Sequence, residues 1–151
     1  MQTRRKTLQH SAIVAGMLAA TGLFPGHALA FNAKAFDAKT VSDALKALGA
    51  AAPTESKDVT IIGPDIAENG AVVPLGASTS LAGVKQLLIL VEKNPSTLVA
   101  AFNLTDSVDA NISARAKMGQ SSDVYAVAIM TDGRTFFAKK EVKVTLGGCG
   151  G

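Results

Sequence analysis

Cys149 is the only cysteine of the chain, and it lies two residues before the carboxyl terminus with two glycines on each side. Glycine has no side chain to bury, and fixing a residue in a single conformation costs about 1–2 kcal/mol of backbone entropy. We therefore expect a mobile arm at residues 147–151, which are Gly147, Gly148, Cys149, Gly150 and Gly151. Five extended residues reach about 17 Å, and a backbone without side chains can enter a narrow channel. The sequence thus predicts a thiol that enters a pocket of another protein.

This thiol lacks the neighbours that activate a catalytic cysteine. Reactive cysteines lie beside cations, metals or helix N-termini, which stabilise the thiolate. The charge expected nearest to Cys149 is the terminal carboxylate of Gly151, and an anion disfavours the thiolate. The residues therefore favour a carrier whose chemistry is supplied by other proteins, and we expect that the chain is not an enzyme.

The first thirty residues have the pattern of an export signal. Arg4 and Arg5 open a basic stretch, an apolar stretch follows over residues 11–24, and Ala28 and Ala30 form a small-residue cleavage pattern. The apolar stretch is too short for a transmembrane helix, which needs about 20 apolar residues. We interpret residues 1–30 as a signal peptide removed after Ala30. The adjacent arginines favour the twin-arginine type, with the general export route as the alternative.

Removal of the signal peptide changes the charge and the available chemistry. Three of the 15 Lys and Arg residues leave with it, so 12 remain against 12 Asp and Glu residues. This balance argues against nucleic acid or an anionic membrane surface as a partner. Both histidines, His10 and His27, also leave. Neither a zinc site nor histidine-dependent nucleophilic catalysis is then possible, so we expect no metal, no cofactor and no membrane span after cleavage.

The residues that remain predict one small domain over residues 31–146. Val41, Ala44, Leu45 and Leu48 share one face of a helix, which Asp37 or Thr40 can cap and Gly49 can end. About seven short strands follow, at residues 59–62, 71–79, 84–91, 98–105, 112–118, 123–130 and 135–146. Strands at this spacing without helices between them predict an all-β, antiparallel sandwich.

Turns and alternation give further expectations. Asp132-Gly133 predicts a hairpin, and Asn69-Gly70 predicts a turn with one of its residues at positive φ. Apolar residues alternate in two strands, which places on one side of each strand Leu98, Ala100, Phe102 and Leu104, and Ile112, Ala114, Ala116 and Met118.

Three stretches resemble the SoxY family, the sulfur carriers of the periplasmic Sox thiosulfate-oxidation system. They are Glu141-Val-Lys-Val-Thr-Leu-Gly-Gly-Cys-Gly-Gly at the end of the chain, Ile66-Ala-Glu-Asn-Gly70 with Val73-Pro74, and Ile112-Ser-Ala-Arg115. The resemblance implies an immunoglobulin-like fold, a periplasmic location and covalent attachment of thiosulfate-derived sulfur to Cys149. It also implies a heterodimer with a SoxZ-like subunit.

The same resemblance implies transient visits to three enzymes. These are a SoxAX-type haem protein that couples thiosulfate to Cys149, a SoxB-type hydrolase that removes sulfate, and, where present, a SoxCD-type dehydrogenase. The residues alone leave one alternative open: an exported structural or adhesion-type sandwich whose single cysteine forms an intermolecular disulfide.

Overall fold

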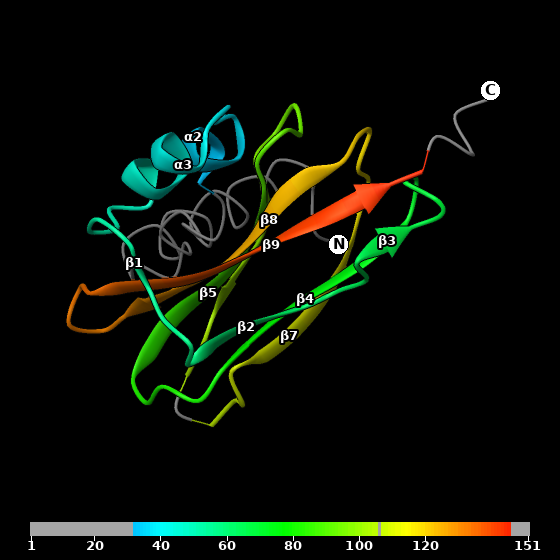
Figure 1. Ribbon diagram of the computed structural model, residues 1–151. Coiled ribbons are helices and arrows are strands. Elements are labelled where there is room, and N and C mark those ends of the chain that lie inside the picture. Colours follow the sequence, from blue (N-terminus) through cyan, green and yellow to red (C-terminus); the bar gives the residue numbers. More distant parts are fainter. Residues whose placement is uncertain (1–31, 106, 146–151) are drawn as a thin grey trace, which may run out of the picture. The chain divides into compact units, whose positions relative to one another are not determined.

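The computed structural model describes residues 32–105 and 107–145 (Figure 1). Two short helices are followed by nine strands within these residues. The elements are α2 (Ala33–Phe36), α3 (Val41–Ala47), β1 (Thr54–Glu55), β2 (Val59–Ile62), β3 (Ile66–Ala67), β4 (Val73–Thr79), β5 (Val84–Val91), β6 (Leu98–Asn103), β7 (Asn111–Ala116), β8 (Ser122–Met130) and β9 (Thr135–Val144). The predicted export signal, with Arg4, Arg5, Ala28 and Ala30, and the predicted arm, with Cys149 and its glycines, lie outside the described residues.

The strands form a sandwich of two sheets. The larger sheet has the order β1-β9-β8-β5-β6, with β3 also paired to β9, and the smaller has the order β2-β4-β7. All the longer strands pair antiparallel, which confirms the all-β sandwich. The sequence did not predict β1 and β3, which pair parallel to the two ends of β9. Strands of two residues are too short to show the alternation by which a strand is recognised.

The core has two parts, one on each face of the larger sheet. Leu87 and Ile89 of β5 pack toward the smaller sheet, and Leu88 and Leu90 pack toward the helices. Figure 1 shows α2 and α3 over one face of the larger sheet and β2, β4 and β7 over the other. Because both of its faces are covered, β5 is a continuous apolar run rather than an alternating one.

The predicted helix is present as α3, and α2 is a second, short helix that the sequence did not predict. The side chain of Asn32 accepts a hydrogen bond from the Ala35 N–H and caps α2, and Thr40 Oγ1 accepts one from the Asp43 N–H and caps α3. Thr40 is extended, with φ −131° and ψ 153°, so the chain cannot continue as one helix through it. The predicted end is confirmed, because Gly49 has φ +70° directly after the turn that closes α3.

Alternation is confirmed in β7, and in the predicted strand at residues 98–105 it is confirmed for Ala100, Phe102 and Leu104 but is wrong for Leu98. Ile112, Ala116 and Met118 are buried, as predicted. Leu98, however, packs on the helix-covered face while Ala100 and Phe102 pack toward the smaller sheet. The register between β5 and β6 shifts at Ile89/Leu90, and a bulge of this kind turns the following side chains to the opposite face.

Candidate functional site

Strand β9 leads to the predicted arm, and its two ends are fixed by different contacts. It begins after the predicted hairpin turn, where Gly133 has φ +88° and its N–H donates to Met130 O at 3.1 Å. Thr145 is the last described residue after β9. Cys149 lies four residues further along the chain, so the residues around Thr145 decide where any arm begins. We call Lys143, Val144 and Thr145 the arm base.

Three hydrogen bonds donated by backbone N–H groups hold the arm base on both sides. On one side the Lys143 N–H donates to Asp65 O at 2.9 Å, and the Thr145 N–H donates to Ala67 O at 3.1 Å. On the other side the Val144 N–H donates to the hydroxyl oxygen of Ser121 at 2.9 Å. Successive N–H groups of a strand point to opposite edges, so bonds from three consecutive residues fix both edges of the arm base.

Gly70 brings a third segment against the arm base. Its carbonyl accepts a hydrogen bond from the Met118 N–H at 2.7 Å. A Cβ atom at Gly70 would lie 2.3 Å from Met118 O and 2.8 Å from Val144 Cγ1. The predicted turn is present, because Asn69 Oδ1 accepts a hydrogen bond from the Ala71 N–H.

The predicted positive φ at Asn69 or Gly70 is wrong. Among the described residues only Gly49, Gly83 and Gly133 have positive φ. Glycine is required at position 70 for a different reason, the close approach of backbone and side-chain atoms from β9 and from the segment before β8.

Lys140 of β9 binds the residues that directly precede β3. Its ammonium group donates to Gly63 O at 2.8 Å and forms an ion pair with Asp65 Oδ1 at 2.7 Å. The hydrogen bond and the charge of Lys140 hold the pKa of the Asp65 carboxyl below its ordinary value of 3.8. The same residue, Asp65, thus contacts β9 through its side chain and through its carbonyl oxygen.

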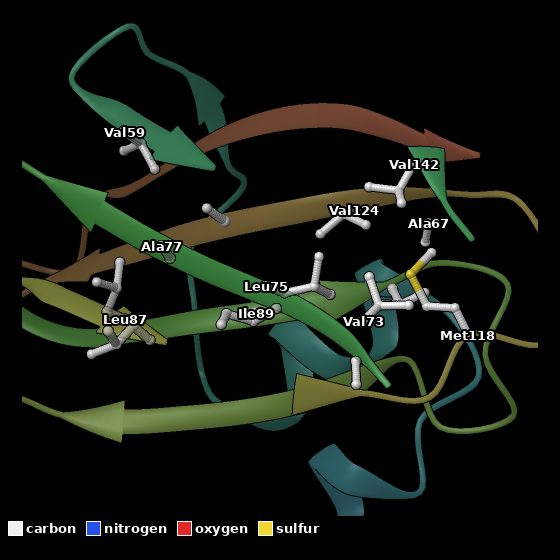
Figure 2. Close-up of a cluster of buried hydrophobic side chains, with 14 of the residues drawn as sticks. Val59, Ala67, Val73, Leu75, Ala77, Leu87, Ile89, Met118, Val124 and Val142 are labelled. Atoms are coloured by element: carbon white, nitrogen blue, oxygen red, sulfur yellow. The ribbon is translucent and has the colours of Figure 1, made fainter. Parts of the chain in front are cut away.

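The core below the arm base is closed by apolar side chains from four segments. Figure 2 shows Ala67, Val73, Met118 and Val142 gathered at this end of the sandwich. All four are buried, with exposed fractions of 6% or less. Buried side chains on both β3 and β9 hold the two strands together as part of the core.

Two further ion pairs among the described residues involve no residue of the arm base. Lys139 and Asp123 form an ion pair at 3.3 Å, which raises the pKa of the Lys139 ammonium. Burial, and then the charge of Glu92, raise the pKa of Tyr125. In the β8–β9 turn the backbone N–H of Arg134, and then its guanidinium group, donate hydrogen bonds to the Asp132 carboxylate and lower the pKa of Asp132.

The described residues also contain no cluster of side chains of the kind that usually holds a metal ion. No group of three or more His, Cys, Asp or Glu side chains within residues 32–105 and 107–145 is placed to hold a metal ion. Two hollows have volumes of about 530 and 540 Å³. One is lined by residues such as Lys57 and Asn111 and the other lies beside α3, and neither is lined by the arm base. Within the described residues, no helix has the length and apolar character of a membrane span.

The fold and the site define a class of protein: a small immunoglobulin-like sandwich that fixes the strand leading to a terminal thiol. The sequence matches the family described as sulfur oxidation protein SoxY over residues 44–149. The chain therefore belongs to the SoxY family, and its role is that of a sulfur carrier. The resemblance seen in the sequence is confirmed.

Solved structures agree with this assignment. The sulfur carrier protein SoxY from Chlorobium limicola f thiosulfatophilum is 33% identical, with a TM-score of 0.64, and the match covers 71% of this chain and 97% of that one. A superoxide reductase (neelaredoxin) from Ignicoccus hospitalis is 15% identical, with a TM-score of 0.51 and coverage of 58% and 79%. The second likeness shows the fold alone. No curated protein matches the sequence.

Proposed function

We propose that Cys149 is the residue to which sulfur is covalently attached, and that the SoxY-family role of this chain is carried out by residues 147–151. The observation that carries the proposal is the fixed arm base. Thr145 is bonded to Ala67 and its neighbour Val144 to Ser121, four and five residues before the only cysteine of the chain. A carrier needs a fixed residue from which its arm extends and an arm long enough to enter another protein. The four residues from Thr145 to Cys149 extend about 14 Å.

Two chemical steps follow from a thiol and thiosulfate. In the first, the thiol and thiosulfate lose two electrons and one proton and form a Cys–S–S–sulfonate, and a SoxAX-type haem protein accepts the electrons. In the second, water attacks the sulfonate sulfur and a SoxB-type hydrolase releases sulfate, which leaves a persulfide on Cys149. Where a SoxCD-type dehydrogenase is present, that enzyme accepts six electrons as the outer persulfide sulfur takes three oxygens from three water molecules and becomes a sulfonate. A second hydrolysis then releases sulfate and returns the thiol of Cys149. The described residues contain no histidine, so the partners supply the acid–base groups and the electron acceptor.

We further propose export to the periplasm and pairing with a second subunit. The basic start, apolar stretch and Ala-Leu-Ala ending of residues 1–30 support export, and Arg4 and Arg5 support the twin-arginine route. Family membership supports partner subunits in general, and a SoxZ-like subunit in a heterodimer is the specific proposal. Neither the family match nor the similar structures support the alternative of a disulfide-linked structural protein.

Intact-mass measurement tests the attachment site. The purified carrier is incubated with thiosulfate and the haem protein, and its C-terminal peptide is expected to gain the mass of one thiosulfate at Cys149. The Cys149→Ser variant is the control and should gain none. An adduct elsewhere in the chain, or equal labelling of Cys149→Ser, would contradict the proposal.

The glycines provide a second test, which separates the carrier from the structural alternative. Gly148→Trp or Gly150→Trp should slow turnover by the hydrolase while the unfolding transition stays that of the wild type. A disulfide-linked structural protein would tolerate these changes and would run as a reductant-sensitive dimer under denaturing conditions.

A further inference from the structure

Large apolar side chains that are exposed concentrate in one short segment. Among the described residues four are strongly exposed: Ile62 at 48%, Ile66 at 57%, Val72 at 54% and Val108 at 55%. Three of the four lie between residues 62 and 72, while Val108 lies in the connection between β6 and β7. Single exposed apolar residues are ordinary on a protein surface, but a cluster of them marks an interaction site.

Ile66 and Val72 lie beside buried residues of β3 and β4. Each directly precedes a buried residue, Ala67 or Val73, whose side chain is part of the core. Successive side chains of a strand point to opposite faces. Ile66, which pairs with β9 as part of β3, therefore cannot turn inward unless Ala67 leaves the core.

The segment that carries these side chains is held by bonds spread along its length. Lys140 holds Gly63 and Asp65, Asp65 O and Ala67 O accept N–H groups of the arm base, and Gly70 O accepts the Met118 N–H. Its apolar surface is therefore presented by a fixed backbone. A preformed surface loses less conformational entropy when it binds a partner.

The segment also lies within the reach of the arm. Ala67 O is 3.1 Å from Thr145 N, and Ile66 is the next residue to Ala67. Gly70 lies against Val144, and Val72 is two residues from Gly70. Consecutive Cα atoms are about 3.8 Å apart, and the four residues from Thr145 to Cys149 extend at most about 14 Å. An enzyme that takes Cys149 into its active site must approach Thr145 to within about that distance, and Ile66 and Val72 lie in the segment that borders Thr145.

We propose that Ile66 and Val72 form the docking surface for the enzyme that cleaves the S–S bond of the loaded arm. The inference rests on the proposed attachment of sulfur to Cys149. The partner it fits is a hydrolase whose active-site entrance has an apolar rim. The arm supplies the reacting group, and the docking surface supplies contact that does not depend on which sulfur species the arm carries.

Steady-state hydrolysis tests this surface. The carrier is loaded chemically with tetrathionate, which places a sulfonate-terminated disulfide on Cys149 and releases thiosulfate, so no coupling enzyme is needed. Sulfate release by the purified hydrolase is then measured against carrier concentration. The double variant Ile66→Ser/Val72→Ser should raise KM by about tenfold, as the loss of a central apolar contact does. Its kcat should stay that of the wild type.

Val108→Ser is the matched control, because Val108 is as exposed and lies outside the segment. Its KM should stay unchanged, and all variants should keep the wild-type unfolding transition because the altered side chains are exposed. The conservative single variant Ile66→Val keeps an apolar side chain at position 66 and should keep most of the affinity of the wild type for the hydrolase.

The outcomes separate this inference from the proposed function. If the loaded wild type releases no sulfate, the proposed function fails. If the wild type is turned over and the double variant has the same KM, the docking surface is wrong and the attachment site stands. If the double variant loses its partner subunit on gel filtration, that subunit covers Ile66 and Val72, and the docking surface is likewise overturned.

Discussion

Strand β9 is held along its outer edge by two parallel strands of two residues each, and the two contacts are built differently. At the start of β9, both residues of β1 are exposed, and the neighbouring Ser56 N–H donates to Phe137 O. At the end of β9, β3 contributes a buried Ala67. This second contact is strengthened by Lys140, Ser121 and Gly70. Pairing of two parallel residues with β9 is thus an exposed contact at the start of β9 and part of the hydrophobic core at its end.

This difference shows which end of β9 the fold holds in place with more contacts. The reinforced end is the one that precedes Cys149 in the sequence, and the lighter end follows a hairpin turn that already fixes the chain. The start of β9 is held by the β8 strand through the hairpin, whereas its end is held by hydrogen bonds from the segment around β3 and from Ser121. Four predictions test this comparison.

The largest effect is expected from Met118→Ala, which empties the core below the arm base. Met118 is 1% exposed, and truncation of such a side chain costs about 2–5 kcal/mol. Amide hydrogen exchange should accelerate at Thr145 and remain unchanged at Ser56. Val59→Ala, at the opposite end of the core, should show the reverse pattern. Equal acceleration at both amides in both variants would mean that the two ends open together.

Gly70→Ala should be the next in size. The added Cβ would lie 2.3 Å from Met118 O and 2.8 Å from Val144 Cγ1, and overpacking of this kind costs about 1–3 kcal/mol. Gly119→Ala is the control, because a Cβ there meets nothing within 4 Å. Urea unfolding should show a lower midpoint for Gly70→Ala alone. Tolerance of alanine at position 70 would contradict the close approach.

Ser121→Ala removes the hydroxyl that accepts the Val144 N–H at 2.9 Å. Loss of one partly buried hydrogen bond costs about 0.5–1.5 kcal/mol. Ser56→Ala, at the lighter contact, removes a serine whose side-chain hydrogen bonds are exposed and should have a smaller effect. Thermal unfolding of the two variants measures the difference directly. Equal losses of stability in Ser121→Ala and Ser56→Ala would mean that the two ends of β9 are held equally strongly.

The smallest effect is expected from Asp65→Asn, and it should depend on pH. Lys140 lowers the pKa of Asp65 in the folded protein below 3.8, so the ion pair stabilises the fold above that pH. The contribution is lost as the pH falls through the folded pKa. The difference in unfolding free energy between wild type and variant should therefore be present at pH 7 and shrink below about pH 3.8. A difference independent of pH would show that the carboxylate charge does not contribute.

The sequence predicted the parts of this arrangement that depend on local pattern. The run Val-Lys-Gln-Leu-Leu-Ile-Leu-Val became β5 with its predicted ends, and Asp132-Gly133 became the hairpin turn. The cap at Thr40 and the inward position of Met118 were also correct. Each of these features follows from the residue types within a few positions of the chain.

The fixed arm base was not predictable in the same way. Pairs such as Ser121 with Val144, or Lys140 with Gly63, join residues 23 and 77 positions apart, and no local pattern brings them together. At Gly70 the sequence correctly predicts a turn, but the reason that it gives for glycine, a positive φ, is wrong. A glycine after an asparagine indicates a turn with positive φ, and only the packing of Met118 and Val144 shows that space is what the position requires.

The place of β9 in the sheet has a consequence for how the protein is made. Among the described strands β9 comes last in the sequence, yet it lies inside the larger sheet, with β8 on one edge and β1 and β3 on the other. A nascent chain emerges from the ribosome with its amino-terminal residues first, so the larger sheet stays incomplete until β9 has been translated. A product of premature termination that lacks Val142 would expose Val73 and Met118 and be open to proteolysis. The order of synthesis thereby couples completion of the domain to the presence of nearly all the sequence up to Cys149.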